Sequence, residues 1–146
     1  MNDFRQLAEG FWASPQIGVD EVALAASRGF SLIINNRPDG ESPDQTAGED
    51  IAAAARAHGL GYCAVPITPG GFSLAQVNAL AAALAGAAGP VLAYCRSGTR
   101  STLLWSLVQS MQGTDPDAVA EAAAQAGYDV APIRAIMDDL AATARG

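Results

Sequence analysis

A helical pattern followed by a short apolar run with β-propensity occurs three times in succession in this chain. The helical stretches cover residues 19–29, 48–59 and 73–89, and each of them ends on a glycine. The apolar runs that follow cover residues 30–36, 62–67 and 90–94. Strands that are apolar along their whole length are typical of parallel strands buried on both faces. The repeat therefore predicts an α/β fold with a parallel central sheet flanked by helices.

The whole chain, residues 1–146, is expected to form a single domain. Half of its 146 residues are apolar, which is enough for one core of ordinary size. After the third strand the sequence predicts three more helices, at about residues 101–112, 117–127 and 132–145. Trp105 lies in the first of them and is expected in the core. No stretch rich in serine, proline or charge divides the chain into two parts.

Composition excludes several classes of function. The formal charge of −7 argues against nucleic-acid binding, which needs a basic face. Two cysteines and one histidine are too few for a disulfide framework or a structural zinc site, so we expect no metal, no cofactor and a reducing compartment. The first residues lack a basic segment followed by an apolar core, and no apolar run reaches membrane-spanning length. The sequence therefore predicts a cytoplasmic protein without a membrane partner.

The segment YCRSGTRS carries the clearest chemical signal. Cys95 lies where the third strand ends, and Ser101 lies where the next helix begins. The intervening residues are Arg96, Ser97, Gly98, Thr99 and Arg100. In such a tight strand-to-helix loop the backbone N–H groups turn inward, a glycine permits the turn, and the helix N-terminus adds a positive field. The loop is therefore predicted to bind an anion, and the same field favours a nucleophilic thiolate.

Each residue of this segment has an expected role. Cys95 is the candidate nucleophile. Arg100 is expected to hold the oxyanion of a substrate, since its planar fork suits a phosphoryl or sulfonyl group. Ser101 is expected to donate a hydrogen bond to the Cys95 sulfur and so stabilise it as a leaving group. Arg96 is expected to bind through its backbone N–H, while its side chain either touches substrate or faces solvent.

The loop resembles those of two enzyme families. YCRSGTRS is similar to the active-site loop of single-domain rhodaneses, sulfurtransferases that carry a persulfide on their cysteine. It is also similar to the loop of cysteine phosphatases, in which an arginine followed by serine or threonine closes the motif. Tyrosine and dual-specificity phosphatases have one more residue between cysteine and arginine than this chain. A shorter loop makes a narrower anion-binding cradle, formed by residues 95–100. By loop length alone, this narrower cradle suits a single sulfur atom.

A second motif widens the resemblance. Residues 13–41, which end in INNRPDGE, together with YCRSGTRS resemble the phosphatase-like domain of beta-lactamase hydrolase-like proteins, a bacterial family related to dual-specificity phosphatases. The resemblance covers about residues 13–112. It implies a dual-specificity-phosphatase-like architecture, with Cys95 forming a phosphocysteine intermediate.

One departure concerns the general acid. Dual-specificity phosphatases supply an aspartate from the loop before the last helix–strand pair, but the matching segment VPITPGGFS has no carboxylate. Replacement acids are expected from Asp39, Glu41 or Asp44 in the segment RPDGESPD, although Asp39 in Pro-Asp-Gly is also a typical turn residue. Arg37 ends a strand and is expected either to line the site or to pair with a neighbouring carboxylate.

Three functions follow, in order of preference. The first is phosphoryl hydrolysis through a phosphocysteine. The second is sulfur transfer through a Cys95 persulfide, which needs no general acid. The third is a non-catalytic module that binds an anion or a phosphoprotein. The expected partners are accordingly an anionic small molecule or a phosphoprotein, or a sulfur donor and acceptor.

Overall fold

The central element of the computed structural model, which describes residues 3–68 and 70–145, is a five-stranded sheet. Its strands are β1 (Arg5–Ala8), β2 (Phe11–Ser14), β3 (Leu32–Asn35), β4 (Gly61–Ala64) and β5 (Val91–Tyr94), in the order β1-β2-β5-β3-β4. Only the β1–β2 pair is antiparallel, and the other three pairs are parallel. All four residues of β5 are buried, as expected for the central strand.

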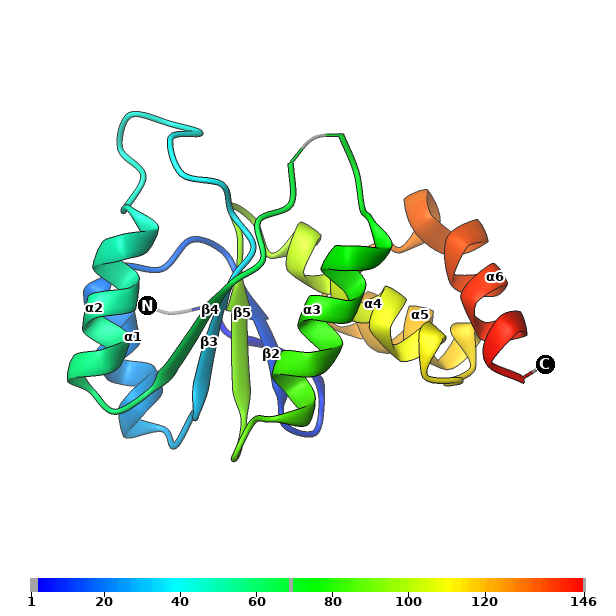
Figure 1. The fold of residues 1–146 in the computed structure, drawn as a ribbon, viewed down its shortest axis with the longest axis horizontal. Helices are drawn as coiled ribbons and strands as arrows, with labels where there is room; N and C mark the ends of the chain where they lie inside the picture. The colour runs from blue at the N-terminus through cyan, green and yellow to red at the C-terminus, as the bar shows by residue number, and fades with distance from the viewer. Residues whose placement is uncertain (1–2, 69, 146) are drawn as a thin grey trace.

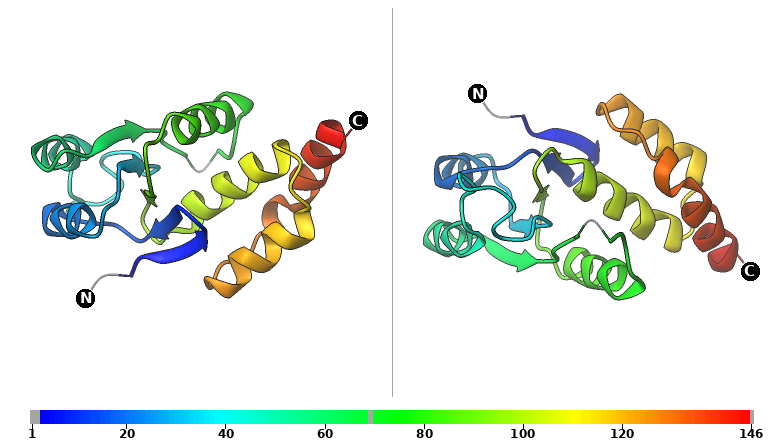
Figure 2. Two further views of the ribbon diagram at one scale, coloured as in Figure 1. Left: turned by 90° about the horizontal axis from the view of Figure 1, so that it is seen from below. Right: turned by 90° about the horizontal axis from the view of Figure 1, so that it is seen from above.

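Helices cover both faces of the sheet (Figure 1). The helices α1 (Val19–Ser27) and α2 (Gly48–Ala57) lie on one face, and α3 (Leu74–Ala85) and α4 (Thr99–Met111) lie on the other. The last two helices, α5 (Pro116–Gln125) and α6 (Arg134–Arg145), pack beside α4 (Figure 2), and α5 also contacts the edge strand β1. A 3-10 turn, η1 (Ala131–Ile133), joins them. The α/β class and the parallel central sheet predicted from sequence are confirmed.

The N-terminal hairpin of β1 and β2 is the element that the sequence did not predict. Its two strands have four residues each, too few for a clear alternation of apolar and polar residues. Most of the predicted elements are also shorter in the structure than in the prediction. Each of the three predicted strands has four residues, and α3 ends at Ala85 rather than at residue 89. In contrast, α4 begins at Thr99, two residues earlier than expected.

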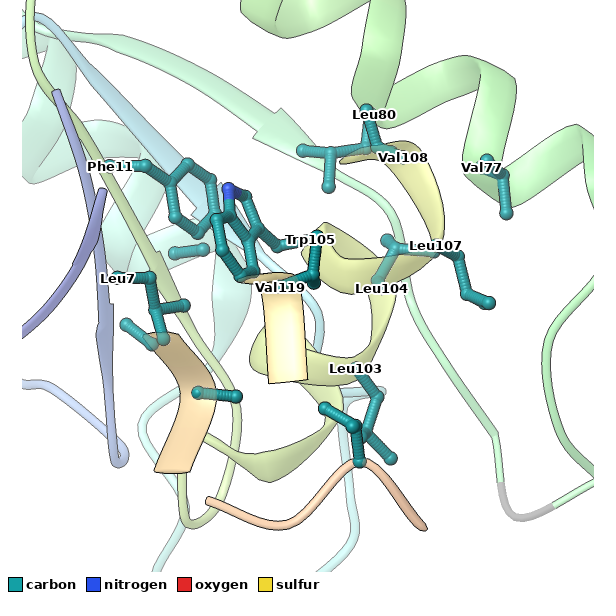
Figure 3. Close-up of a cluster of buried hydrophobic side chains, with 14 of the residues drawn as sticks. Leu7, Phe11, Val77, Leu80, Leu103, Leu104, Trp105, Leu107, Val108 and Val119 are labelled. Atoms are coloured by element: carbon teal, nitrogen blue, oxygen red, sulfur yellow. The ribbon is translucent and has the colours of Figure 1, made fainter. Parts of the chain in front are cut away.

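The helix α4 runs through the middle of the larger hydrophobic core (Figure 3). Trp105 is 4% exposed and stacks on Phe11 of β2 with ring centroids 6.0 Å apart, which confirms its predicted core position. The buried hydroxyls of Thr102, Ser106 and Ser110 each donate to the carbonyl four residues earlier. Because these three hydroxyls are paired inside the helix, α4 can be buried on nearly all sides and form a rigid base for the loop that precedes it.

Strand register brings the candidate site together. Tyr94, the last residue of β5, lies opposite both Ser14 of β2 and Asn35 of β3. The segments that follow these three strands therefore leave the sheet at the same edge. The long connections after β3 and β4 rise from that edge as well (Figure 1). The segments that follow β2, β3, β4 and β5 thus meet at the point where β5 passes into α4.

Candidate active site

Cys95 lies at the base of the strand-to-helix loop. Its side chain is fully buried, and its backbone N–H donates to the carbonyl of Ser14 at 3.3 Å, which continues the strand pairing. The N–H of Gly98 points back at the thiol and donates to Cys95 Sγ at 3.1 Å. Gly98 has a φ of +91° and is the N-cap of α4. The predicted cradle therefore has a backbone donor aimed at the sulfur, and the N-terminus of α4 follows directly.

The outer residues of the loop are exposed. The Arg96 side chain faces solvent, while its carbonyl accepts from the N–H of Gln16 at 3.2 Å. The hydroxyl of Ser97 donates to Thr99 Oγ1 at 2.9 Å and accepts from the Thr99 N–H at 3.3 Å. Of the two positions considered for the Arg96 side chain, the structure shows the one that faces solvent.

Ser101 lies in the first turn of α4 and is completely buried. Its hydroxyl has no hydrogen-bond partner among the residues that the structure describes. An unpaired buried hydroxyl costs free energy, about 1–3 kcal/mol, so few such groups occur in native structures. The hydrogen bond from Ser101 to the Cys95 sulfur that the sequence predicted is not formed in this structure.

Arg100 is held by two groups from outside the loop. Its Nη1 and Nη2 donate to the two carboxylate oxygens of Glu41, each at 2.8 Å, in a bidentate ion pair. Nη1 also donates to the carbonyl of Ile67 at 2.8 Å. A guanidinium has five N–H groups, so these three bonds leave the Nε–H and one Nη2–H, which point outward along the same edge of the planar group. Arg100 can therefore offer a second fork to a substrate while it remains paired to Glu41.

Arg37 is a second arginine that binds the Glu41 carboxylate. It is 5% exposed, and its Nε donates to Glu41 Oε1 at 2.9 Å. Its two terminal nitrogens donate to Gln16 Oε1 at 3.0 Å and Ser42 Oγ at 3.2 Å. Of the two roles considered for Arg37, the structure shows the ion pair, at the edge of the site.

The two guanidiniums determine the charge of Glu41. Hydrogen bonding to Arg100, reinforced by Arg37, lowers the pKa of Glu41 to about 2, against a smaller opposing effect of burial. The hydrogen bonds to Glu41 are also the main cause of a raised pKa of Arg100. Desolvation opposes this rise, and the nearby Cys95 thiol adds to it. Glu41 is thus a carboxylate throughout the neutral range and has no proton to give as a general acid.

The other two candidate acids are engaged elsewhere. Asp39 Oδ1 accepts from the Gly48 N–H at 2.8 Å, so Asp39 caps the start of α2. Asp44 is exposed, and its hydrogen bond from Ser42 at 2.8 Å is the main cause of a lowered pKa. The structure places only Glu41 against Arg100, and there it is an anion that positions an arginine.

Two residues near the loop were not found from sequence. Gln16 joins the site through its contacts with Arg96 and Arg37. Tyr128 follows α5, and its hydroxyl donates to the carbonyl of Ser97 at 3.2 Å. Neither stands in a recognisable motif. The position of Gln16 two residues after a strand would have indicated it, had β2 been predicted.

A pocket of about 370 Å³ opens beside Arg37. It is mainly apolar, and Pro66 and Thr68 in its wall flank Ile67, the residue that accepts from Arg100. The remaining lining residues are Asn35, Pro38, Asp39, Gly48, Glu49, Ala52, Tyr62 and Ala64. The pocket therefore reaches both chain neighbours of Ile67, whereas Arg100 is not among its lining residues.

Neither metal ligands nor a membrane segment are found in the described residues. Within residues 3–68 and 70–145, histidine, cysteine and carboxylate side chains form no group of three or more that would hold a metal ion. Over the same residues, no helix has the length and apolar character needed to span a bilayer.

Comparisons with known proteins agree with this architecture. The sequence profile described as "Beta-lactamase hydrolase-like protein, phosphatase-like domain" matches residues 3–112. The beta-lactamase hydrolase-like protein of Xylella fastidiosa (strain Temecula1) is 41% identical over 100 residues, which are 68% of this chain and 23% of that protein. The matched segment thus spans less than a quarter of the length of this relative.

Solved structures resemble almost the whole chain. A candidate phosphatase from Neisseria meningitidis Z2491 superposes with a TM-score of 0.85 at 30% identity, over 96% of this chain and 99% of that one. TpbA of P. aeruginosa, solved in complex with pTyr, has a TM-score of 0.69 at 18% identity, over 99% and 91% of the two chains. The second likeness shows a common fold, that of cysteine-phosphatase-like proteins.

Proposed function

We propose that this chain, which belongs to the family of phosphatase-like domains of beta-lactamase hydrolase-like proteins, hydrolyses phosphomonoesters with Cys95 as the nucleophile. The observation that carries the proposal is the arrangement of Cys95 Sγ, the Gly98 N–H that donates to it and the Arg100 guanidinium beside it. These are the parts that a thiolate attack on a tetrahedral anion requires.

In the proposed reaction Cys95 attacks phosphorus. The S–P bond forms as the P–O bond to the alcohol breaks, and the electron pair of that bond leaves with the oxygen. The loop amides and the two unused N–H groups of Arg100 bind the equatorial oxygens, where negative charge is held. Water then attacks the phosphocysteine, inorganic phosphate leaves, and the Ser101 hydroxyl donates to the departing sulfur.

The substrate is proposed to be an ester of a good leaving group. The carboxyl group that contacts Arg100 is Glu41, which is ionised at neutral pH, so the leaving oxygen departs without a proton from it. An aryl oxide leaves readily as an anion, whereas an alkoxide does not. The aryl part of such a substrate is proposed to occupy the apolar pocket beside Arg37, whose wall includes both chain neighbours of Ile67, the residue that accepts from Arg100.

Sulfur transfer is the second candidate, and loop length favours it. Only Arg96, Ser97, Gly98 and Thr99 separate the cysteine from the arginine. In this reaction Cys95 attacks the sulfane sulfur of thiosulfate, sulfite leaves with the electron pair, and an acceptor later removes the sulfur from the persulfide. The leaving anion is stable, so no general acid is needed.

Phosphate release and intact mass test the two reactions side by side. The protein is incubated with para-nitrophenyl phosphate or with thiosulfate, and Cys95→Ser is carried through both as the control. Phosphoryl hydrolysis predicts phosphate release that Cys95→Ser abolishes. Negligible phosphate release together with the mass of one added sulfur atom on Cys95 would replace hydrolysis by sulfur transfer. Binding of phosphate without either reaction would leave an anion-binding module.

A further inference from the structure

The peptide group between Ser97 and Gly98 is hydrogen-bonded at both ends. Its N–H donates to Cys95 Sγ at 3.1 Å, and its carbonyl accepts from Tyr128 Oη at 3.2 Å. The hydroxyl, the peptide and the sulfur therefore form one continuous chain of hydrogen bonds. A donor at the carbonyl polarises the peptide and strengthens its N–H as a donor, so Tyr128 acts on the sulfur without touching it.

The orientation of this peptide decides what faces the thiol. Gly98 has a φ of +91°, and a glycine tolerates several orientations of the adjoining peptide. If the peptide turned over, its carbonyl oxygen would replace its N–H on the side of the sulfur, and an acceptor would repel a thiolate or a bound anion. The hydrogen bond from Tyr128 holds the carbonyl on the outer side of the loop.

Tyr128 is itself firmly placed. It is 7% exposed, and the Arg5 guanidinium of β1 lies 5.3 Å from the centre of its ring. Arg5 Nη1 also donates to the carbonyl of Ala126 at 3.2 Å, which ties β1 to the segment that carries the tyrosine. Burial is the main cause of a raised pKa of Tyr128, so its hydroxyl stays a protonated donor at neutral pH.

We propose that Tyr128 is a positioning residue for the Cys95 loop, holding the 97–98 peptide with its N–H toward the sulfur. Tyr128 lies beyond residues 3–112, so the functional unit extends past the segment that the family profile matches into the C-terminal helices. The inference rests on the proposed function in one respect, that Cys95 reacts as a thiolate.

The test is the pH dependence of Cys95 alkylation by iodoacetamide in Tyr128→Phe, read by peptide mass so that Cys63 is scored separately. Among the described residues, the charged and titratable groups coupled to the thiol are Arg100, which pairs with Glu41, and Tyr128, which has Arg5 over its ring. The substitution removes only the Tyr128 hydroxyl. We expect the midpoint of alkylation to move to higher pH, and the rate at pH 7 to fall roughly 2- to 10-fold, the size of one hydrogen bond.

Ser106→Ala is the matched control. It removes a buried hydroxyl that donates to a carbonyl at 2.8 Å within α4, away from the loop. Both variants are expected to lower the melting temperature by a similar small amount, but only Tyr128→Phe shifts the alkylation profile. An unchanged profile in Tyr128→Phe, or an equal shift in Ser106→Ala, would overturn the inference.

The alkylation profile does not require turnover. A shift in Tyr128→Phe would therefore support the positioning role even if the wild type released no phosphate, the outcome that would end the phosphatase proposal. Conversely, phosphate release with an unmoved profile would overturn the role of Tyr128 and leave the proposed reaction standing.

Discussion

Glu41 and Arg100 are 59 residues apart in the chain and form a bidentate ion pair with two bonds of 2.8 Å. Arg37 donates to the same carboxylate at 2.9 Å, so one anion aligns two arginines at the edge of the cradle. The pair occupies the terminal nitrogens of Arg100 and directs its remaining N–H groups to one side. Glu41 therefore acts as a brace for the arginine that is proposed to bind the phosphoryl group.

Removing this brace is expected to impair catalysis. In Glu41→Ala the Arg100 side chain loses its bidentate partner, and we expect kcat/KM toward para-nitrophenyl phosphate to fall about 10- to 100-fold, because misplacing a binding group by about 1 Å can cost that much. Glu41→Gln keeps the length and one acceptor and should lose less. Steady-state kinetics measure both, and a rise in activity would mean that Glu41 competes with substrate instead of positioning Arg100.

The same carboxylate predicts how stability depends on pH. Its pKa is lowered to about 2 in the folded protein, so it binds a proton less readily there than in the unfolded chain. Its contribution is fully present above about pH 5 and is lost as pH falls toward about 2. The difference in melting temperature between the wild type and Glu41→Gln should therefore shrink over this window. A difference that stays constant with pH would contradict the ion pair.

The dependence of the rate on the leaving group tests whether the site lacks a general acid. A positioned general acid contributes about 10²- to 10⁴-fold to such a reaction. Without one, kcat/KM should fall by a comparable factor from para-nitrophenyl phosphate to a simple alkyl phosphate. The measurement is a series of phosphate esters of graded leaving-group acidity. Equal rates along the series would show that a proton donor does reach the leaving oxygen.

Glycine at the two ends of α4 provides a matched pair of variants. Gly98 and Gly113 both have positive φ, +91° and +94°. A methyl group at Gly98 would overlap Tyr128 Oη and lie 3.3 Å from the Ser14 carbonyl carbon, whereas one at Gly113 would meet only Ala144 Cβ at 3.9 Å. Gly113→Ala should therefore cost about 1–2 kcal/mol of unfolding free energy, from backbone strain alone.

Gly98→Ala should cost more than this, and it should also abolish phosphate release because the loop must move away from Tyr128. Chemical denaturation and steady-state assays on both variants measure the two effects. Equal stability losses, with activity retained in Gly98→Ala, would show that Tyr128 does not restrain the loop.

Local patterns were sufficient for most of the fold. The three helix–strand units were visible because each helix ends on a glycine and each strand is a short apolar run. Ser73, the N-cap of α3, accepts from the Gln76 N–H, and the Gln76 side chain in turn accepts from the Ser73 N–H, so the start of α3 is fixed locally. The hairpin of β1 and β2 was missed because its strands depend on pairing with β5, a contact across some 80 residues that no local pattern records.

The site was predictable only in part. The segment from Cys95 to Ser101 is contiguous, so its chemistry could be read directly from the residue types. The role of Glu41 could not, because its charge depends on Arg100 and Arg37 meeting in space. Tyr128 carries no signal in the sequence, since it meets the loop through a hydrogen bond to a backbone carbonyl, which no residue type records.

The central claim is that Cys95 carries the phosphoryl group. The most direct measurement is a rapid quench of the protein with para-nitrophenyl phosphate in acid, followed by peptide mass analysis. The account predicts the mass of one phosphoryl group on the peptide that contains Cys95, formed and lost at rates that match turnover and absent in Cys95→Ser. Steady phosphate release by Cys95→Ser, or turnover without any phosphorylated Cys95 peptide, would contradict it.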